Sequence, residues 1–501
     1  MKYDRIFFFV ILMFISVVSL LFFAFYAGPF TENLVGYDAA FFRMVGQGMT
    51  KGMVPYVDFY DMKGPYLFFI EYMAQLICYG RVGIFIVECV NLFLVLLCTA
   101  KIFELHKVNR TYIQKLFYLL PVLCVYLVTL QGGNTNEEFS LLPLMIALYL
   151  CLKYINNCNS GKTMRNSPLY ALIYGFLFGF LFFLRVNNSA FLLVSAFVIV
   201  VCLITYKEYK NLLWNSLAFV IGLVLVSVPV LIYYGVHNAV DVMFDSMFTL
   251  GFRYSGGLSV QDHLRFYVLA IPKFLLAFFP CFILVLFRKK RFGKKLVLYA
   301  VLGCVVTNIA LAVGRLYFHY FLLLIPLLVL GEYLLLYATD DKEPACRRRR
   351  VTSGAVLFVM VGILVGYFCK FTYFDSLHPS PGEVVISYTQ ATDDYIANSK
   401  ELCSCINPDE KDSVYTYGLS SMFYVYNDLF PCNRYCDWQK DYIRLIPSIR
   451  DELMDMLETD PPKWIILDVR RKESDAFEKK VMTTYKLYKE NEMFALFEAK
   501  P

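Results

Sequence analysis

Residues 212–234 read LLWNSLAFVIGLVLVSVPVLIYY, an apolar block without a charged side chain. A helix of about 20 mostly apolar residues can cross a bilayer, so this block is long enough for one span. The sequence therefore predicts a polytopic α-helical membrane protein with about 11 spans. The ten other predicted spans are, approximately, 6–27, 82–100, 113–130, 139–155, 169–184, 189–206, 266–287, 296–313, 319–338 and 351–369.

The composition agrees with this class and excludes several others. Of the 501 residues, 58% are hydrophobic and 18% are charged. A soluble globular protein is nearer half apolar and about a quarter charged. The chain is therefore not expected to be fibrous, disordered or a soluble enzyme. Its net charge of +6 is modest for this length, so membrane lipids are expected as partners and nucleic acid is not.

Basic residues predict the orientation in the membrane. With the N-terminus inside, the inner segments carry 21 Lys and Arg residues and the outer segments before residue 370 carry eight. This is the bias expected for cytoplasmic loops. A twelfth apolar block, 65–79, is too short for a span and is predicted to be a re-entrant or interfacial helix. The prediction is thus a multi-pass protein of the cell membrane with a cytoplasmic N-terminus.

The chain changes character at about residue 370, where charge rises and apolar runs shorten. We therefore predict a transmembrane domain over 1–369 and an α/β domain over 370–501, long enough for its own core. An odd number of spans makes this second domain extracytoplasmic. Its predicted strands are 384–388, 413–417, 464–468 and 494–498, and its predicted helices are 392–403, 442–457 and 473–483.

Four cysteines lie in the predicted outer domain: Cys403, Cys405, Cys432 and Cys436. Disulfides between the first pair and the second would suit an oxidising compartment. A zinc site is a weaker alternative because no histidine lies nearby. Free thiols are the third possibility, and the spacing leaves the three open.

Polar residues gather in the segments predicted to be outside, and ionisable residues beside a bilayer are costly enough to call for a function. A carboxylate there could deprotonate a hydroxyl nucleophile. Cations with Tyr or His donors could hold a phosphate and stabilise it as a leaving group. Together they suit group transfer from a phosphate-linked lipid donor. The candidate carboxylates are Asp38, Asp58, Asp61, Glu137 and Glu138; the cations are Lys63, Arg185 and Arg315; the further donors are His319 and Tyr320.

The candidate residues lie in six short motifs. These are Gly36-Tyr37-Asp38, Pro55-Tyr56-x-Asp58, Asp61-x-Lys63-Gly64-Pro65, Gly132-Gly133-Asn134-x-x-Glu137-Glu138, Arg185-x-Asn187 and Gly314-Arg315-x-Tyr317-x-His319-Tyr320. The motifs resemble those of polyprenyl-phosphate-sugar-dependent GT-C glycosyltransferases, the superfamily of the bacterial aminoarabinose transferase and the protein O-mannosyltransferases. The resemblance covers about 1–370, and the C-terminal domain resembles the exported domains of such proteins more loosely.

This resemblance implies a GT-C-like fold and an inverting hexosyl- or pentosyltransferase. The donor would be a polyprenyl-phosphate sugar and the acceptor an envelope glycan or lipid-linked molecule on the outer face. It matches Asp38 to the family's catalytic carboxylate, Lys63 to a residue that holds the carrier phosphate, and Glu137 or Glu138 to a second acid. Asp38-Ala39 replaces the Asp-Glu pair of the O-mannosyltransferases, so the likeness to mannosyltransferases does not extend to a protein acceptor. No nucleotide sugar is expected, and a need for a divalent metal stays open.

Simpler roles compete with each assignment. Asp38 could cap a helix, Asp58 and Asp61 could be turn residues, Lys63 could snorkel, and the two glutamates could be helix-terminal charges. The arginines could pair with lipid headgroups, and His319 could order an interface. At the level of the whole protein, the alternatives are a transporter or flippase of a lipid-linked substrate, and an envelope-assembly partner. Transport predicts polar residues at mid-membrane depth.

Overall fold

The computed structural model describes residues 2–31, 33–105, 111–255, 261, 289–312, 317–339, 381–470 and 474–500. The chain forms two compact units. The first unit comprises the described parts of Met1–Ala24, Ile86–Ile232 and Gly257–Leu377. The second comprises those of Phe25–Phe85, Tyr233–Gly256 and His378–Pro501, so it joins the first predicted outer loop, residues 28–64, to the C-terminal residues.

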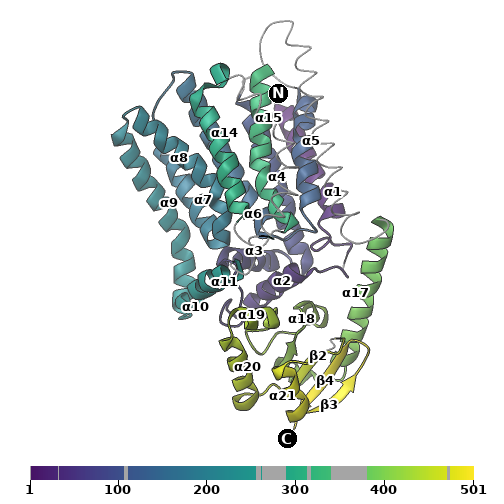
Figure 1. Ribbon diagram of the computed structural model, residues 1–501. Helices are drawn as coiled ribbons and strands as arrows, with labels where there is room; N and C mark the ends of the chain where they lie inside the picture. The colour runs from purple at the N-terminus through teal and green to yellow at the C-terminus, as the bar shows by residue number, and fades with distance from the viewer. Residues whose placement is uncertain are drawn as a thin grey trace. The chain divides into compact units, whose positions relative to one another are not determined.

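Long apolar helices confirm the prediction of a multi-pass α-helical membrane protein. Among the described residues, eight segments are long and apolar enough to cross a membrane, and one of these, Pro168–Thr205, contains two helices. The predicted spans 266–287 and 351–369 lie outside the described residues, so the number of spans stays a prediction. The long helices are α1 (Lys2–Phe23), α4 (Arg81–Glu104), α5 (Tyr112–Thr129), α6 (Asn136–Asn159), α7 (Pro168–Arg185), α8 (Ala190–Thr205), α9 (Tyr209–Val236), α14 (Lys289–Ala312) and α15 (Ile325–Thr339), with short 3₁₀ helices η1 (Val186–Ser189) and η3 (Phe318–Leu324) (Figure 1).

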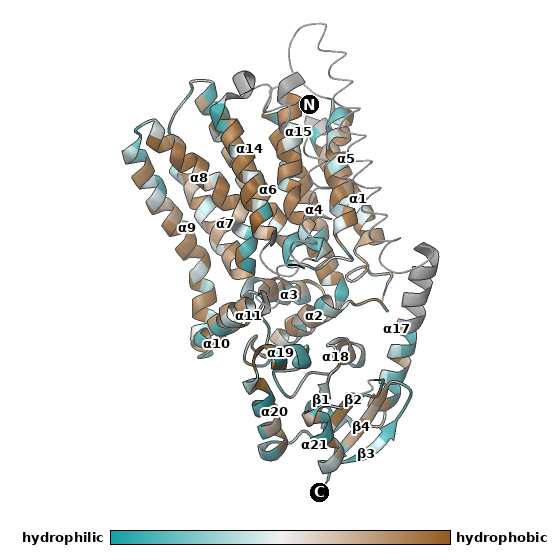
Figure 2. Cartoon of the chain, viewed as in Figure 1, coloured by the Kyte–Doolittle hydropathy of each residue, from teal (hydrophilic) through white to brown (hydrophobic). Residues whose placement is uncertain are grey.

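Helix α6 is central in the first unit, where it packs against α7, α8, α14, α15 and η3. Helices α7 and α9 approach closely through glycines. A Cβ added at Gly175 would meet the Phe219 carbonyl oxygen at 1.9 Å, and one at Gly222 would meet that of Leu172 at 2.0 Å. Small residues let membrane helices pack at such short range. Hydrophobic residues predominate along α9 (Figure 2), and many of them are exposed, as a lipid-facing surface requires.

A four-stranded sheet with order β1-β2-β4-β3 lies in the second unit. Strand β1 is parallel to β2, and β4 is antiparallel to both β2 and β3. The strands are β1 (Val414–Tyr417), β2 (Trp464–Asp468), β3 (Tyr485–Glu490) and β4 (Phe494–Ala499). The α-helices of this unit are α2 (Tyr37–Thr50), α3 (Pro65–Ile77), α10 (Val240–Asp245), α11 (Gly251–Ser255), α17 (Pro381–Cys403), α18 (Met422–Asn427), α19 (Gln439–Leu445), α20 (Ser448–Thr459) and α21 (Ala476–Thr484). The unit also contains the π-helix η2 (Ser246–Leu250) and the 3₁₀ helix η5 (Pro408–Ser413).

The structure corrects three details of the predicted α/β domain. The predicted strand 384–388 lies inside α17, because the helical segment that follows it overrides the β propensity of its Val and Ile residues. The predicted helix 442–457 is two helices, because Pro447 cannot donate the hydrogen bond that a continuous helix would need there. Strand β3 was not predicted, since its exposed, lysine-rich sequence is that of an edge strand.

Tyr60 anchors the first predicted outer loop to the core of the second unit. Its ring centroid lies 5.1 Å from that of Tyr435 and 5.6 Å from that of Tyr442. Its backbone N–H donates to the carbonyl oxygen of Arg434 at 2.9 Å. The same core contains Leu453 of α20 and residues of all four strands. The loop 28–64 and the C-terminal strands therefore share one hydrophobic core.

We expect Leu453→Ala to destabilise the second unit by about 2–5 kcal/mol, because Leu453 is fully buried and its loss leaves a cavity. The matched control is Leu487→Ala, since Leu487 of β3 is about half exposed. Thermal unfolding, monitored by limited proteolysis of the C-terminal residues, measures the stability of both variants. An equal loss of stability in the two would contradict the placement of Leu453 in the core.

Candidate active site

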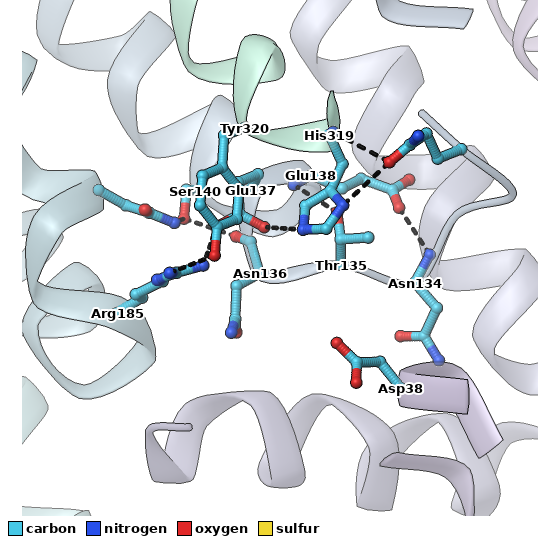
Figure 3. Close-up of polar contacts among 12 residues, drawn as sticks. Asp38, Asn134, Thr135, Asn136, Glu137, Glu138, Ser140, Arg185, His319 and Tyr320 are labelled. Atoms are coloured by element: carbon cyan, nitrogen blue, oxygen red, sulfur yellow. Dashed lines mark hydrogen bonds and ion pairs between the residues drawn. The ribbon is translucent and has the colours of Figure 1, made fainter. Parts of the chain in front are cut away.

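The ends of three membrane-spanning segments bring together an acid, a cation and a tyrosine in the first unit (Figure 3). Glu137 lies in the first turn of α6, Arg185 is the last residue of α7, and Tyr320 lies in η3. Arg185 Nη1 donates to Glu137 Oε1 at 2.7 Å, and Arg185 Nη2 donates to the Tyr320 hydroxyl at 2.6 Å. The guanidinium carbon also lies 4.4 Å from the Tyr320 ring centroid. These contacts fix the position of the arginine from two sides.

His319 joins this group through Glu137 and Gln131. Its Nε2 lies 3.6 Å from Glu137 Oε2. Its backbone N–H and its Nδ1 are 3.1 and 3.2 Å from Gln131 Oε1. Because that amide oxygen can only accept, Nδ1 is the donor in this contact, and Nε2 faces the glutamate. We define the Arg185 cluster as Glu137, Arg185, His319, Tyr320 and Gln131.

The Arg185 cluster can bind an anion. An arginine has five N–H donors, and the contacts with Glu137 and Tyr320 engage two of them. The Arg185 side chain is 30% exposed whereas that of Glu137 is 2% exposed. The arginine can therefore offer further donors to a phosphate group, while the glutamate holds it in place from the buried side.

Glu138 is adjacent to Glu137 but has a different environment. It is fully buried, and it accepts hydrogen bonds from the Tyr126 hydroxyl at 2.6 Å and from the Asn134 backbone N–H at 3.0 Å. Glu88 Oε1 of α4 accepts from the same Asn134 N–H. These contacts hold the loop before α6 and favour a structural role for Glu138, so its catalytic role stays an unsupported prediction.

Lys63 lies between two carboxylates in the second unit. Its Nζ is 3.7 Å from Asp38 Oδ1 and 3.5 Å from Asp61 Oδ2. Asp38 is in the first turn of α2, but Gly36 is the N-cap residue, so the capping role considered for Asp38 does not apply. The Asp38 side chain is 49% exposed and that of Asp61 is 3% exposed. Asp38 is therefore accessible to a substrate. We call Asp38, Asp61 and Lys63 the Lys63 cluster.

Asp61 positions the lysine. Its Oδ1 accepts the Lys63 backbone N–H at 2.8 Å, and the Tyr56 hydroxyl donates to the Lys63 carbonyl at 2.6 Å. Burial raises the pKa of Asp61, while the charge of Lys63 and the backbone hydrogen bond oppose that rise. The Lys63 Nζ also lies 5.2 Å from the Phe42 ring centroid. The ammonium group is thus held at one place on the surface of this unit.

Asp58 is a predicted residue that lies outside both clusters. Asp58 accepts the Val54 backbone N–H at 2.6 Å, which is the contact of a turn residue. Arg315 lies outside the described residues, as does Lys273, a further cation in a predicted span.

Sequence reasoning missed several residues of these environments. Gln131 directly precedes the Gly132-Gly133 motif, and Glu88 interrupts the apolar block 82–100. An acid inside a predicted span is itself a signal, because such residues are costly. Glu332 in α15 is another example, and both of its carboxylate oxygens are buried without a hydrogen bond in the described part of the chain.

Asp437 was not singled out in the sequence, and only the fold shows that it is buried. It is buried in the second unit, where the Ser421 hydroxyl donates to it at 2.6 Å. Burial raises its pKa from the ordinary value of 3.8 to about 7. A carboxyl group whose pKa is raised by folding binds more protons in the folded state between these two values, so its contribution to stability falls as the pH rises through this range.

We therefore expect Asp437→Asn to change the pH dependence of stability. Relative to the variant, the wild type should lose thermal stability from about pH 4 to about pH 7 and change little above pH 7, because the variant has no proton to lose. Melting temperatures of both proteins across this range test the expectation. Parallel pH profiles would contradict it.

The four cysteines of the C-terminal region are free thiols in the structure. Within the described ranges, no group of three or more His, Cys, Asp or Glu side chains is placed to hold a metal ion. The structure thus supports neither the disulfides nor the zinc site considered for these cysteines.

Comparison with known proteins finds a similar fold among solved structures. No protein-family model matches the chain, and no curated protein sequence matches it significantly. The crystal structure of ArnT from Cupriavidus metallidurans bound to undecaprenyl phosphate matches with a TM-score of 0.58 and 12% identity over 99% of both chains. The structure of the same protein in the apo state matches with a TM-score of 0.55 and 10% identity over 93% of this chain and 94% of that one. The likeness shows that the chain has the fold of ArnT, as the resemblance of its motifs implied.

Proposed function

We propose that this chain, which has the fold of ArnT, is an integral membrane glycosyltransferase. Its donor is a sugar carried on a polyprenyl phosphate, and its acceptor is an envelope glycan or a lipid-linked molecule. The position of the Arg185 side chain carries the proposal: a partly exposed cation is fixed by Glu137 and Tyr320 at the ends of three spans. The similar crystal structure of ArnT is bound to undecaprenyl phosphate, which supports a lipid phosphate as the anion.

Each cluster has a role in the proposed reaction. Asp38 removes the proton from an acceptor hydroxyl, whose oxygen forms the new bond to the anomeric carbon of the sugar. The bond from that carbon to the phosphate oxygen breaks, and the polyprenyl phosphate leaves with the electron pair. In the second unit, Lys63 stabilises the negative charge of the leaving phosphate. In the first unit, Arg185 serves to bind the donor. A single displacement inverts the anomeric configuration.

The proposed placement in the membrane follows the sequence predictions. The N-terminus is cytoplasmic, and residues 370–501 form an extracytoplasmic domain that follows the catalytic domain 1–369. Cysteines introduced at exposed positions of the C-terminal domain, such as Lys486, should react with a membrane-impermeant thiol reagent in intact cells. If the introduced cysteines reacted only after the cells were lysed, the C-terminal domain would be cytoplasmic and the proposed orientation would be wrong.

Transport of a lipid-linked substrate is the second candidate. The observation that favours it is Glu332, whose buried carboxylate oxygens lack hydrogen bonds among the described residues of the membrane helices. An unpaired acid inside a span is typical of a transport pathway.

A transfer assay separates the two candidates. The purified protein in lipid vesicles is given a panel of radiolabelled polyprenyl-phosphate sugars and a crude envelope fraction as acceptor. Movement of label from the lipid to the acceptor supports the transferase. Movement of labelled lipid across the bilayer without its consumption contradicts the transferase and supports transport.

A further inference from the structure

A pocket of about 260 Å³ lies in the second unit, at the carboxyl ends of the parallel strands β1 and β2. Segments that follow parallel strands frequently form ligand sites at this edge of an α/β sheet. Its volume is just below the range of about 300–1,000 Å³ for drug-sized ligands, and so suits a single sugar ring. Its lining includes Tyr37, Tyr395, Trp438, Gln439, Lys440 and Arg470.

Trp438 supplies an aromatic surface to this pocket in a strained conformation. Its backbone φ is +54°, which is unusual for a bulky residue. Two hydrogen bonds hold this backbone conformation. The Trp438 backbone N–H donates to Asp437 Oδ1 at 2.8 Å, and its backbone carbonyl oxygen accepts the Tyr442 backbone N–H at 2.9 Å. The side chain nevertheless remains 38% exposed. Backbone strain of this kind is concentrated at functional sites, where the surrounding structure maintains it.

The charged groups of the pocket are already paired. Arg470 donates to both oxygens of Asp468, from Nε at 2.9 Å and from Nη2 at 2.8 Å. Lys440 donates to Glu478 at 2.6 Å. Since these cations are neutralised by neighbouring carboxylates, the pocket is poorly suited to a phosphate or another strong anion.

Donors and acceptors are nevertheless fixed around the aromatic surface. Gln439 donates to the Thr416 carbonyl at 2.9 Å and accepts the Gly418 N–H at 3.2 Å. Among the described residues, the buried Tyr395 hydroxyl has no hydrogen bond of ordinary geometry, although Ser420 lies close enough to interact with it. An aromatic face beside preorganised groups of both kinds matches a sugar ring, which has an apolar face and hydroxyls that both donate and accept.

We propose that this pocket binds a neutral saccharide unit and is the acceptor subsite of the enzyme. Two observations connect the pocket to the Lys63 cluster of the same unit. Tyr37, which lines the pocket, directly precedes Asp38. Asp437 lies close enough to Asp38 for their charges to interact. The saccharide ring therefore binds where a neighbouring hydroxyl group reaches Asp38, the proposed base. The acceptor role rests on the proposed function, whereas saccharide binding does not.

Binding is measured first without any donor. The full chain in lipid nanodiscs is titrated with a panel of neutral methyl glycosides, and binding is followed by saturation-transfer NMR. Trp438→Gly removes the ring and relieves the strained φ, because glycine adopts positive φ freely. We expect this variant to bind at least about tenfold more weakly, with an unchanged or higher melting temperature. Trp214→Ala, at an exposed position of α9, is the control and should bind normally.

The absence of glycoside binding at millimolar concentration, or equal binding by wild type and Trp438→Gly, would overturn the saccharide site. The acceptor role is tested separately with a labelled polyprenyl-phosphate sugar. Trp438→Gly should transfer sugar to the acceptor about tenfold more slowly and should retain donor binding. Unchanged transfer in a variant that no longer binds glycosides would overturn the acceptor role. A wild type that consumes no donor but binds glycosides through Trp438 would refute the proposed function and leave the saccharide site standing.

Discussion

Replacement of Asp38 by Asn is expected to reduce sugar transfer by at least about 100-fold, because a general base contributes about 10²–10⁴-fold to such reactions. Asparagine has the shape of aspartate but cannot accept the proton of the acceptor hydroxyl. The Asp38 side chain is half exposed and its ion pair with Lys63 is long, at 3.7 Å, so the variant should fold normally. Turnover of a labelled polyprenyl-phosphate sugar, compared with its binding, gives the measurement.

The control for this prediction is Asp451→Asn, which makes the same chemical change at an exposed position of α20. It should transfer sugar at the wild-type rate. Donor binding should be similar in all three proteins, since the proposed role of Asp38 is in the chemical step. A variant at Asp38 that turns over like the wild type would remove Asp38 from catalysis.

Replacement of Arg185 by Gln is expected to abolish detectable donor binding and to destabilise the first unit. The arginine is the proposed ligand of the carrier phosphate. Its loss also leaves Glu137 as a buried charge without its closest cation, and breaking a buried ion pair costs about 3–5 kcal/mol. Because Arg185 is itself 30% exposed, we expect the free energy of unfolding to fall by a smaller amount, about 2–3 kcal/mol. Binding of polyprenyl phosphate and thermal unfolding in detergent measure the two effects.

The double variant Arg185→Gln with Glu137→Gln separates these effects. It removes the orphaned charge, so most of the stability should return while donor binding stays lost. Arg165→Gln is a matched control, since the Arg165 ion pair with Glu208 lies at the surface and should contribute about 1 kcal/mol or less. Recovery of donor binding in the double variant would assign Arg185 a purely structural role.

Local signals in the sequence were sufficient for much of the fold. Apolar blocks such as 212–234 coincide with helices such as α9, and the short block after Pro65 is the 13-residue helix α3. Strand β2 was predicted at its exact bounds, because a buried strand in an α/β sheet is a short apolar run. Signals of this kind act over a few neighbouring residues, so no information about distant segments was needed.

The sequence by itself therefore determined that this is a multi-pass membrane protein with a small C-terminal α/β region, and it located the polar segments. Only the tertiary structure decided which of those polar residues meet. Successive residues of a helix point about 100° apart, so Glu137 contacts Arg185 whereas Glu138 is buried against Tyr126. Likewise, Gly418, which follows β1, and Asp468, which ends β2, line one pocket because these strands are parallel neighbours. Contacts between segments far apart in the chain depend on helix rotation and strand order, which no local pattern of residues encodes.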